Sequence, residues 1–149
     1  MTLRTGHIGL NVTDLDRSIA FYRDVLGFGV IGEGEEGGDG GRYAFLGDGD
    51  RLVLTLWEQA RQPYDGARAG LHHLALEADS VERLGEYEQA LRRHGADFAH
   101  DGVVAHREGA ASGGIFFHDP DGTRLEISVP SGAESAPAPH GTAPTCGFF

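Results

Sequence analysis

The fold is decided by a stretch that occurs twice, as HIGLNV at residues 7–12 and as HLALEA at residues 73–78. In each copy, apolar residues alternate with small or polar ones, and this period of two predicts a strand with one apolar face. A helical pattern follows each copy, and Gly27 and Gly95 stand where a helix-ending glycine is expected. The chain is therefore predicted to contain two copies of one structural unit.

Each predicted helix has a start signal and is followed by further strand patterns. Thr13 with Asp16 has the spacing of a capping box, and Asp79 with Glu82 repeats it. A DPDG turn at residues 119–122 separates the last two strand patterns. The predicted strands after the helices are residues 28–31, 43–46, 51–57, 96–98, 114–118 and 124–129. Each unit is therefore predicted to have the order βαβββ, and the fold class is α+β.

We expect a single domain with a tail. The predicted boundaries are 1–130 for the domain, 4–58 for its first module, 59–69 for a linker and 70–130 for its second module. Residues 131–149 are poor in apolar side chains, so a flexible C-terminal tail is predicted there. Residues 32–41, GEGEEGGDGG, predict a flexible loop that lacks the basic and hydroxyl groups of a phosphate site.

Charge and cysteine content exclude several classes of protein. The 12 basic residues are all arginine and face 23 acidic ones, for a formal net charge of −11. This charge repels phosphate backbones and anionic lipids, so neither nucleic acid nor a membrane is an expected partner. The single cysteine, Cys146, excludes an internal disulfide and a thiolate-only metal site. No apolar run approaches the roughly 18 residues of a membrane span, and no signal-peptide pattern is present, so a soluble, cytoplasmic protein is predicted.

Because successive side chains of a strand point to opposite faces, several ionisable residues are predicted to share the face of the sheet away from the helices. His7 and His73 occupy equivalent positions of the repeat on that face, and Glu126 and Thr55 share it. Two imidazoles and one carboxylate can hold Fe(II), Mn(II) or Zn(II) while other coordination positions stay open for substrate. Each residue alone is more simply interpreted as structural, but the equivalence of the two histidines favours a ligand set. His72 has the opposite parity.

Three motifs resemble the vicinal oxygen chelate superfamily, which groups glyoxalase I, extradiol dioxygenases, and fosfomycin- and bleomycin-resistance proteins. They are HIGLNVTDLDRSIAFYRDVLGF from residue 7, LHHLAL from residue 71 and FFHDPDGTRLEI from residue 116. The match covers residues 4–130. The resemblance implies that the two modules form a cupped mixed sheet around a divalent metal ion. Carried over position by position, it implies that His7, His73 and Glu126 bind that ion.

A three-ligand set is similar to that of the extradiol dioxygenases and of the fosfomycin thiol transferases. We therefore expect a divalent-metal-dependent enzyme acting on a small oxygenated organic substrate, with extradiol-type dioxygenase chemistry and Fe(II) or Mn(II) preferred over zinc, nickel or cobalt. His118 and His106 are the candidate acid–base groups, because imidazole titrates near neutrality. The candidate substrate-binding residues are Tyr43, Thr55, Trp57 and Phe116. Phe116 stands where dioxygenases carry a tyrosine, and Tyr43 where fosfomycin enzymes carry a phosphonate-binding one.

Three alternatives remain open at this point, one of them a structural paralogue that binds no substrate. Another is a glyoxalase-like lyase or isomerase, a class in which glyoxalase I has a fourth ligand, a glutamate in the last strand of the first module. Matching Arg51-Leu52-Val53-Leu54 with residues 124–127 places this ligand at Val53, which cannot bind a metal ion. A metal-free drug-binding protein, similar to the bleomycin-resistance members, suits the acidic charge if its ligand is cationic. The resemblance also implies a homodimer, and the sequence leaves open whether His7 meets His73 of its own chain or of the neighbouring one.

Overall fold

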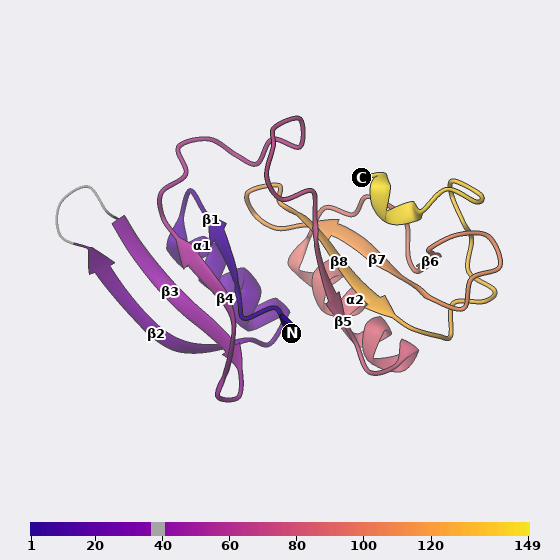
Figure 1. The fold of residues 1–149 in the computed structure, drawn as a ribbon, viewed down its shortest axis with the longest axis horizontal. Coiled ribbons are helices and arrows are strands. Elements are labelled where there is room, and N and C mark those ends of the chain that lie inside the picture. The colour runs from indigo at the N-terminus through magenta and orange to yellow at the C-terminus, as the bar shows by residue number, and fades with distance from the viewer. Residues whose placement is uncertain (37–40) are drawn as a thin grey trace. The chain divides into compact units, whose positions relative to one another are not determined.

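The protein has two compact units, residues 1–64 and 65–149, and each contains one four-stranded mixed sheet (Figure 1). This computed structural model describes residues 1–36 and 41–149. Both units follow the order βαβββ, so the predicted α+β fold class is confirmed. Among the described residues, no helix is both long and apolar enough to cross a bilayer. The predicted domain and module boundaries stay predictions.

The first unit places one parallel and two antiparallel strand pairs side by side. Its sheet order is β1-β4-β3-β2, with β1 parallel to β4 and the other pairs antiparallel. The helical segment on one face is a short α-helix that continues as a π-helix. The elements are β1 Ile8–Asn11, α1 Leu15–Ala20, η1 Phe21–Val25, β2 Gly29–Glu36, β3 Gly41–Asp48 and β4 Arg51–Trp57.

The second unit repeats this arrangement with a shorter strand at one edge of its sheet. Its sheet order is β5-β8-β7-β6, again with a parallel pair, β5 and β8, followed by antiparallel pairs. The elements are β5 Leu74–Glu77, α2 Val81–His94, β6 Val104–Ala105, β7 Gly113–His118, β8 Arg124–Val129 and the 3-10 helix η2 Thr145–Gly147.

The helices begin one residue later than the capping boxes predict. The Asp14 carboxylate accepts the Arg17 N–H at 3.0 Å, and the Ser80 hydroxyl accepts the Arg83 N–H at 3.1 Å. Asp and Ser are as good at this position as the predicted Thr and Asp, so the neighbouring polar residues compete for the cap. Gly95 caps α2 in the left-handed conformation, at a φ of 80°.

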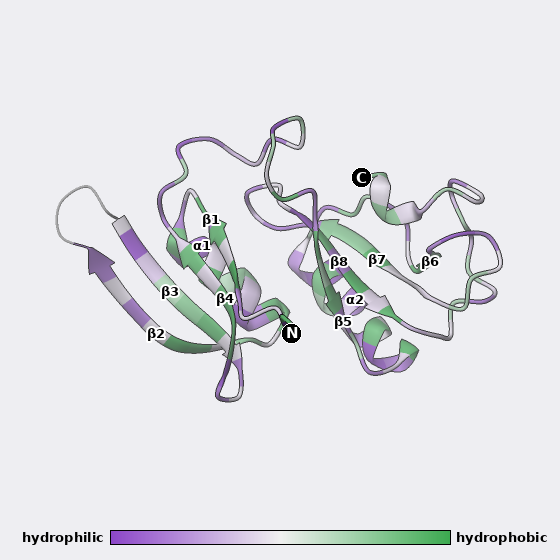
Figure 2. Cartoon of the chain, in the orientation of Figure 1, coloured by the Kyte–Doolittle hydropathy of each residue, from purple (hydrophilic) through white to green (hydrophobic). Residues whose placement is uncertain are grey.

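Apolar residues at every second strand position pack the sheets against the helices. The polar or aromatic residues between them lie on the opposite face. Figure 2 shows the apolar character of β4 and the change of β2 toward hydrophilic residues. The fully buried side chains include Leu54 and Leu56 of β4, Leu84 and Leu91 of α2, and Ile115, Phe117 and Leu125 of the second sheet. The open face of each sheet, the one away from α1 or α2, therefore carries the polar and aromatic side chains.

Three segments differ from the sequence prediction. Residues 96–98 form no strand and contribute one isolated bridge, Phe98 to Phe117. Part of the predicted loop at 32–41 belongs to β2, since Glu33 to Glu36 pair with β3; residues 37–40 lie outside the described residues. The expected flexible tail is instead seated on the second unit, where the Ala105 N–H donates to the Pro137 carbonyl at 2.8 Å and Thr145 is fully buried. Backbone hydrogen bonds to β6 and to the loop after it hold this segment, and its poor apolar content gave no sign of them.

Candidate functional site

Glu126 is the centre of the candidate site in the second unit. It lies on β8, opposite Ala75 of the parallel strand β5 and opposite Phe116 of the antiparallel strand β7. Its parity places it on the open face, yet its side chain is only 3% exposed. A carboxylate this deeply buried needs polar partners, because burying an unpaired charge is costly. Two histidines provide them.

His73, immediately before β5, faces one oxygen of this carboxylate. Its Nε2 atom lies 3.6 Å from Oε2 of Glu126, and its Nδ1 atom is hydrogen-bonded to Nδ1 of His72 at 2.8 Å. Burial lowers the pKa of His73, and the nearby charge of Glu126 opposes this shift in part. His73 is therefore a neutral imidazole at pH 7, which is the form that binds a metal ion.

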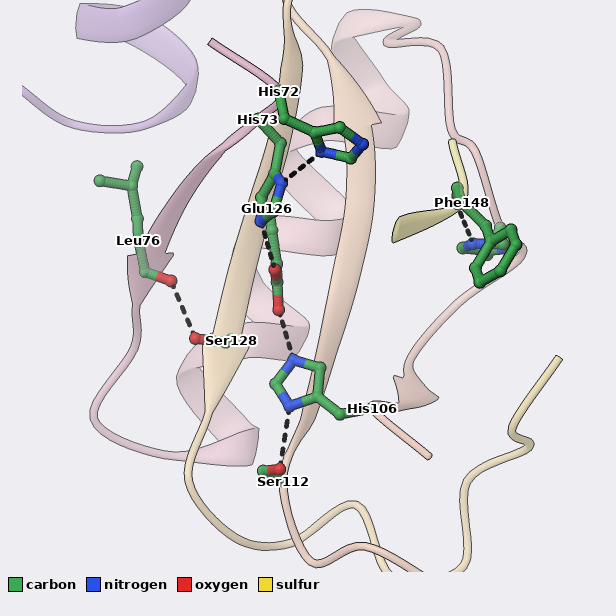
Figure 3. A network of polar contacts seen from close by, with 9 residues as sticks. His72, His73, Leu76, His106, Ser112, Glu126, Ser128 and Phe148 are labelled. Atoms are coloured by element: carbon green, nitrogen blue, oxygen red, sulfur yellow. Dashed lines mark hydrogen bonds and ion pairs between the residues drawn. The ribbon is translucent and has the colours of Figure 1, made fainter. Parts of the chain in front are cut away.

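His106, in the loop after β6, contacts the other carboxylate oxygen. A carboxylate can only accept, so His106 Nε2 donates to Oε1 of Glu126, and the Ser112 hydroxyl donates to His106 Nδ1 at 2.9 Å. Figure 3 shows the resulting line of polar groups, from Ser112 through His106 and Glu126 to His73 and His72. Three predicted site residues are thus brought together by structure: His73, His106 and Glu126.

His118 and Phe116 alternate along β7 on the same face of the sheet, and the polar partner of His118 is Asp97. The Nδ1 atom of His118 lies 3.1 Å from Oδ2 of Asp97. Phe116 is fully buried, with its ring 6.3 Å from that of His106 and 5.5 Å from that of His100, centroid to centroid. Phe116 therefore forms part of the floor beside Glu126, and it is covered.

The remaining predicted site residues belong to the first unit. His7 is exposed just before β1, in the position that corresponds to His73 before β5. Trp57 Nε1 donates to the Thr55 hydroxyl at 3.0 Å, and the Tyr43 ring lies 5.1 Å from that of Trp57. Phe45 joins them, so the open face of this sheet carries an aromatic cluster, Tyr43, Phe45 and Trp57, that is half-buried.

The strand register corrects the position predicted for a fourth ligand. Ala75 pairs with Glu126 in the second sheet, and the equivalent Gly9 pairs with Thr55 in the first. The position that corresponds to Glu126 is therefore Thr55 and not Val53. The sequence match failed because β4 starts two residues earlier relative to its parallel partner, next to an irregularity at Leu46 and Gly47. Glu58 is engaged elsewhere, since its Oε2 accepts the Leu15 N–H at 2.6 Å.

With the geometry described, the comparison with known families is direct. Residues 4–127 match the model of the Glyoxalase/Bleomycin resistance protein/Dioxygenase superfamily. The chain belongs to this superfamily. The vicinal oxygen chelate resemblance is thereby confirmed, and Glu126 lies on the last strand of the family domain.

Relatives within the superfamily carry different activities in their names. A lactoylglutathione lyase of Salmonella typhimurium is 32% identical over 84% of this chain and 91% of its own length. A catechol-2,3-dioxygenase of Bacillus subtilis is 28% identical over 82% of this chain, which spans 40% of that protein. A solved superfamily domain from Frankia sp. EAN1pec has a TM-score of 0.73 at 26% identity, covering 87% of this chain and 98% of that one. The relatives support an enzyme of the superfamily, without selecting one reaction.

The donor set of the second unit suits a divalent metal ion. Two ligands each about 2.1 Å from an ion lie roughly 3.0–3.5 Å apart at ordinary coordination angles, close to the 3.6 Å between His73 Nε2 and Glu126 Oε2. No group of three or more His, Cys, Asp or Glu side chains arranged for an ion occurs within residues 1–36 and 41–149. His7, of the first unit, stays the predicted third ligand.

Two participants were missed by sequence reasoning. His72 contacts His73, although its parity had placed it on the helix side; it precedes β5, where strand alternation does not yet apply. Phe149 lies beside His73, with ring centroids 5.7 Å apart, and no local pattern in the sequence indicates where the last residues dock.

Proposed function

We propose that this chain is a divalent-metal-dependent enzyme of the superfamily, in which His73 and Glu126, completed by His7, hold the ion. The observation that carries the proposal is the buried Glu126 carboxylate, which offers Oε2 toward the neutral imidazole of His73 while His106 holds Oε1. A buried carboxylate placed beside an imidazole on an open sheet face is a metal-ligand arrangement with vacant positions for substrate.

The substrate class is a small oxygenated organic molecule, and extradiol-type ring cleavage is the preferred reaction. The catechol-2,3-dioxygenase relative supports this preference. A bound divalent ion would polarise two substrate oxygens and, if it is iron, activate dioxygen. His106 would orient Glu126 and hold a proton at Nε2, and His118 would be the second acid–base group. Tyr43, Thr55, Trp57 and Phe116 would bind substrate. Fe(II) or Mn(II) is the proposed ion.

A glyoxalase-like lyase is the second candidate, because the lactoylglutathione lyase relative is 32% identical and matched over 91% of its length. Glyoxalase I resembles this chain but uses a glutamate as fourth ligand, and the corresponding residue here is Thr55, which is 3% exposed. A threonine hydroxyl supplies no negative charge to an ion, so this residue disfavours the lyase. The homodimer and the cytoplasmic location remain predictions.

Metal content is the test of the proposal. Chelator-stripped protein is given Fe(II) without oxygen, or Mn(II), and its metal content is measured after dialysis. We expect one ion per wild-type chain and none for His7→Ala, His73→Ala or Glu126→Gln. His94→Ala is the matched control, since His94 is exposed in the last turn of α2 and should leave binding unchanged.

The outcomes separate the candidate functions. A wild-type chain that stays metal-free in excess metal overturns the proposal and favours a metal-free drug-binding protein. If the ion binds, cleavage of catechol by the Fe(II) protein is expected, whereas isomerisation of the hemithioacetal of methylglyoxal and glutathione would establish the lyase instead.

A further inference from the structure

The last residues of the sequence lie over the open face of the second sheet, next to the candidate metal pair. Thr145, at the start of η2, is their anchor: it is fully buried, its N–H donates to the His106 carbonyl at 2.8 Å, and its hydroxyl donates to the Ala105 carbonyl at 2.7 Å. This anchor ties the segment to the loop that carries His106. Residues 146–149 continue from it across the sheet.

The Phe149 ring is surrounded by side chains from β7, β8 and the approach to β5. Its centroid lies 5.5 Å from that of Phe116, 5.7 Å from that of His73 and 5.9 Å from that of His118. The Arg124 guanidinium lies 5.6 Å from the same centroid, within the range of a cation–π contact. The His72 ring lies 6.4 Å away, so the Phe149 ring is surrounded by a second aromatic ring, three imidazoles and a guanidinium.

Phe148 is held differently, and away from the site. Its ring stacks on His140 at a centroid distance of 3.8 Å, and its carbonyl accepts from His100 Nε2 at 3.0 Å. Its side chain is 42% exposed. The side chains of these adjacent residues therefore point to different places: Phe149 lies on the candidate site and Phe148 on the neighbouring surface.

Phe149 occupies space that the proposed function needs. Three of the residues around its ring are a candidate ligand, a candidate acid–base group and a candidate substrate-binding residue: His73, His118 and Phe116. Phe116 has no exposed surface, and the Phe149 ring is one of the groups that cover it, together with the rings of His100 and His106. The Phe149 ring therefore lies where a ring of a bound ligand would contact the same three residues.

We propose that the Phe149 ring marks a subsite for an aromatic ring of the ligand, and that residues 146–149 are displaced from it when the ligand binds. The subsite comprises His73, Phe116, His118 and Arg124, whose edges, faces and positive charge favour a flat aromatic group over an aliphatic one. Thr145 keeps its two backbone contacts and serves as the pivot. The inference rests on the proposed function for the roles of His73 and His118.

The experiment uses metal-free protein, so that its outcome does not depend on the ion. Binding of 4-fluorophenol is followed by fluorine NMR, with cyclohexanol as the non-aromatic competitor. Removal of the internal ring by Phe149→Ala should tighten 4-fluorophenol binding about three- to tenfold, the size of a lost aromatic contact. A chain ending at Thr145 should give the same gain. Phe148→Ala, the matched control, should leave the affinity unchanged, and cyclohexanol should not compete.

Unchanged or weaker binding in Phe149→Ala and in the shortened chain overturns the inference, because Phe149 would then be a wall of the site and not its occupant. Equal gains in Phe148→Ala would also overturn it, since the effect would not be local to the subsite. Metal content distinguishes the two proposals: a chain that binds no metal but gains affinity for 4-fluorophenol keeps the subsite and loses the enzyme, and the reverse result keeps the enzyme alone.

Discussion

The carboxylate of Glu126 accepts a hydrogen bond from Nε2 of His106, a residue 20 positions earlier in the chain. This contact fixes the side-chain conformation of Glu126 and leaves its second oxygen facing His73. In metal sites, such a partner orients the ligand and sets its basicity. Sequence reasoning assigned His106 to acid–base chemistry alone, and the contact adds a positioning role to it.

Replacing His106 should weaken metal binding without abolishing it. His106→Ala frees one oxygen of Glu126, and losses of about 10–100-fold in affinity are typical when such a partner is removed. Competition with a chelator measures the affinity, and elemental analysis the stoichiometry. His106→Gln retains a side-chain N–H donor and should recover part of the affinity. Complete loss of the ion in His106→Ala would make His106 a ligand and contradict the positioning role.

His72 should contribute less than His106. If Nε2 of His73 held an ion, Nδ1 would carry the ring proton and donate a hydrogen bond to Nδ1 of His72. His72 is exposed, so water can replace it, and His72→Ala should reduce metal affinity by less than about tenfold. His72→Asn, with a side-chain acceptor, should be milder still. If His72→Ala removed the ion entirely while His73→Ala did not, the ligand assignment would move by one residue.

The reactivity of Cys146 should report the docking of the last residues. Burial raises the pKa of the Cys146 thiol, and the negative charge of Glu126 raises it further. At a given pH less reactive thiolate is therefore present than in the unfolded chain. We expect slower alkylation by iodoacetamide at pH 8 than in urea, with the rise in rate displaced to higher pH.

Glu126→Gln removes the negative charge that raises the pKa of Cys146. The rise in alkylation rate should therefore occur at lower pH than in the wild-type protein, although burial keeps it at higher pH than in the unfolded chain. Mass spectrometry of the alkylated protein gives the rates. A native rate profile that coincides with the one in urea would mean that residues 145–149 do not remain docked in solution.

Two glycines should respond oppositely to alanine. Gly85 lies in α2 with open space around its Cβ position, so Gly85→Ala should stabilise the protein by about 1 kcal/mol. At Gly114 on β7, a Cβ would collide with the backbone carbonyl of Ile127, and Gly114→Ala should destabilise by about 1–3 kcal/mol. Urea unfolding of the two variants measures both changes. A stabilising Gly114→Ala would contradict the packing of β7 against β8.

The repeat, the fold class and much of the secondary structure follow from the sequence alone. Alternation within residues 51–57 and 124–129 predicts β4 and β8 at their observed bounds, because a half-buried strand has a period that local pattern records. Parity likewise places Glu126 and Phe116 on one face. The predicted strand at 96–98 is absent because three residues carry too little pattern to outweigh competing loop contacts.

Tertiary structure decided what the pattern could not express. The correspondence of Glu126 with Thr55 depends on how far β4 slides along β1, which hydrogen-bond register sets and residue spacing does not. The partnership of Glu126 with His106 joins a strand to a loop, and the docking of Phe149 joins the last residue to three separate elements. Local sequence determines periodicity, because neighbours in the chain share one backbone. Contacts between distant segments arise only once packing has brought those segments together.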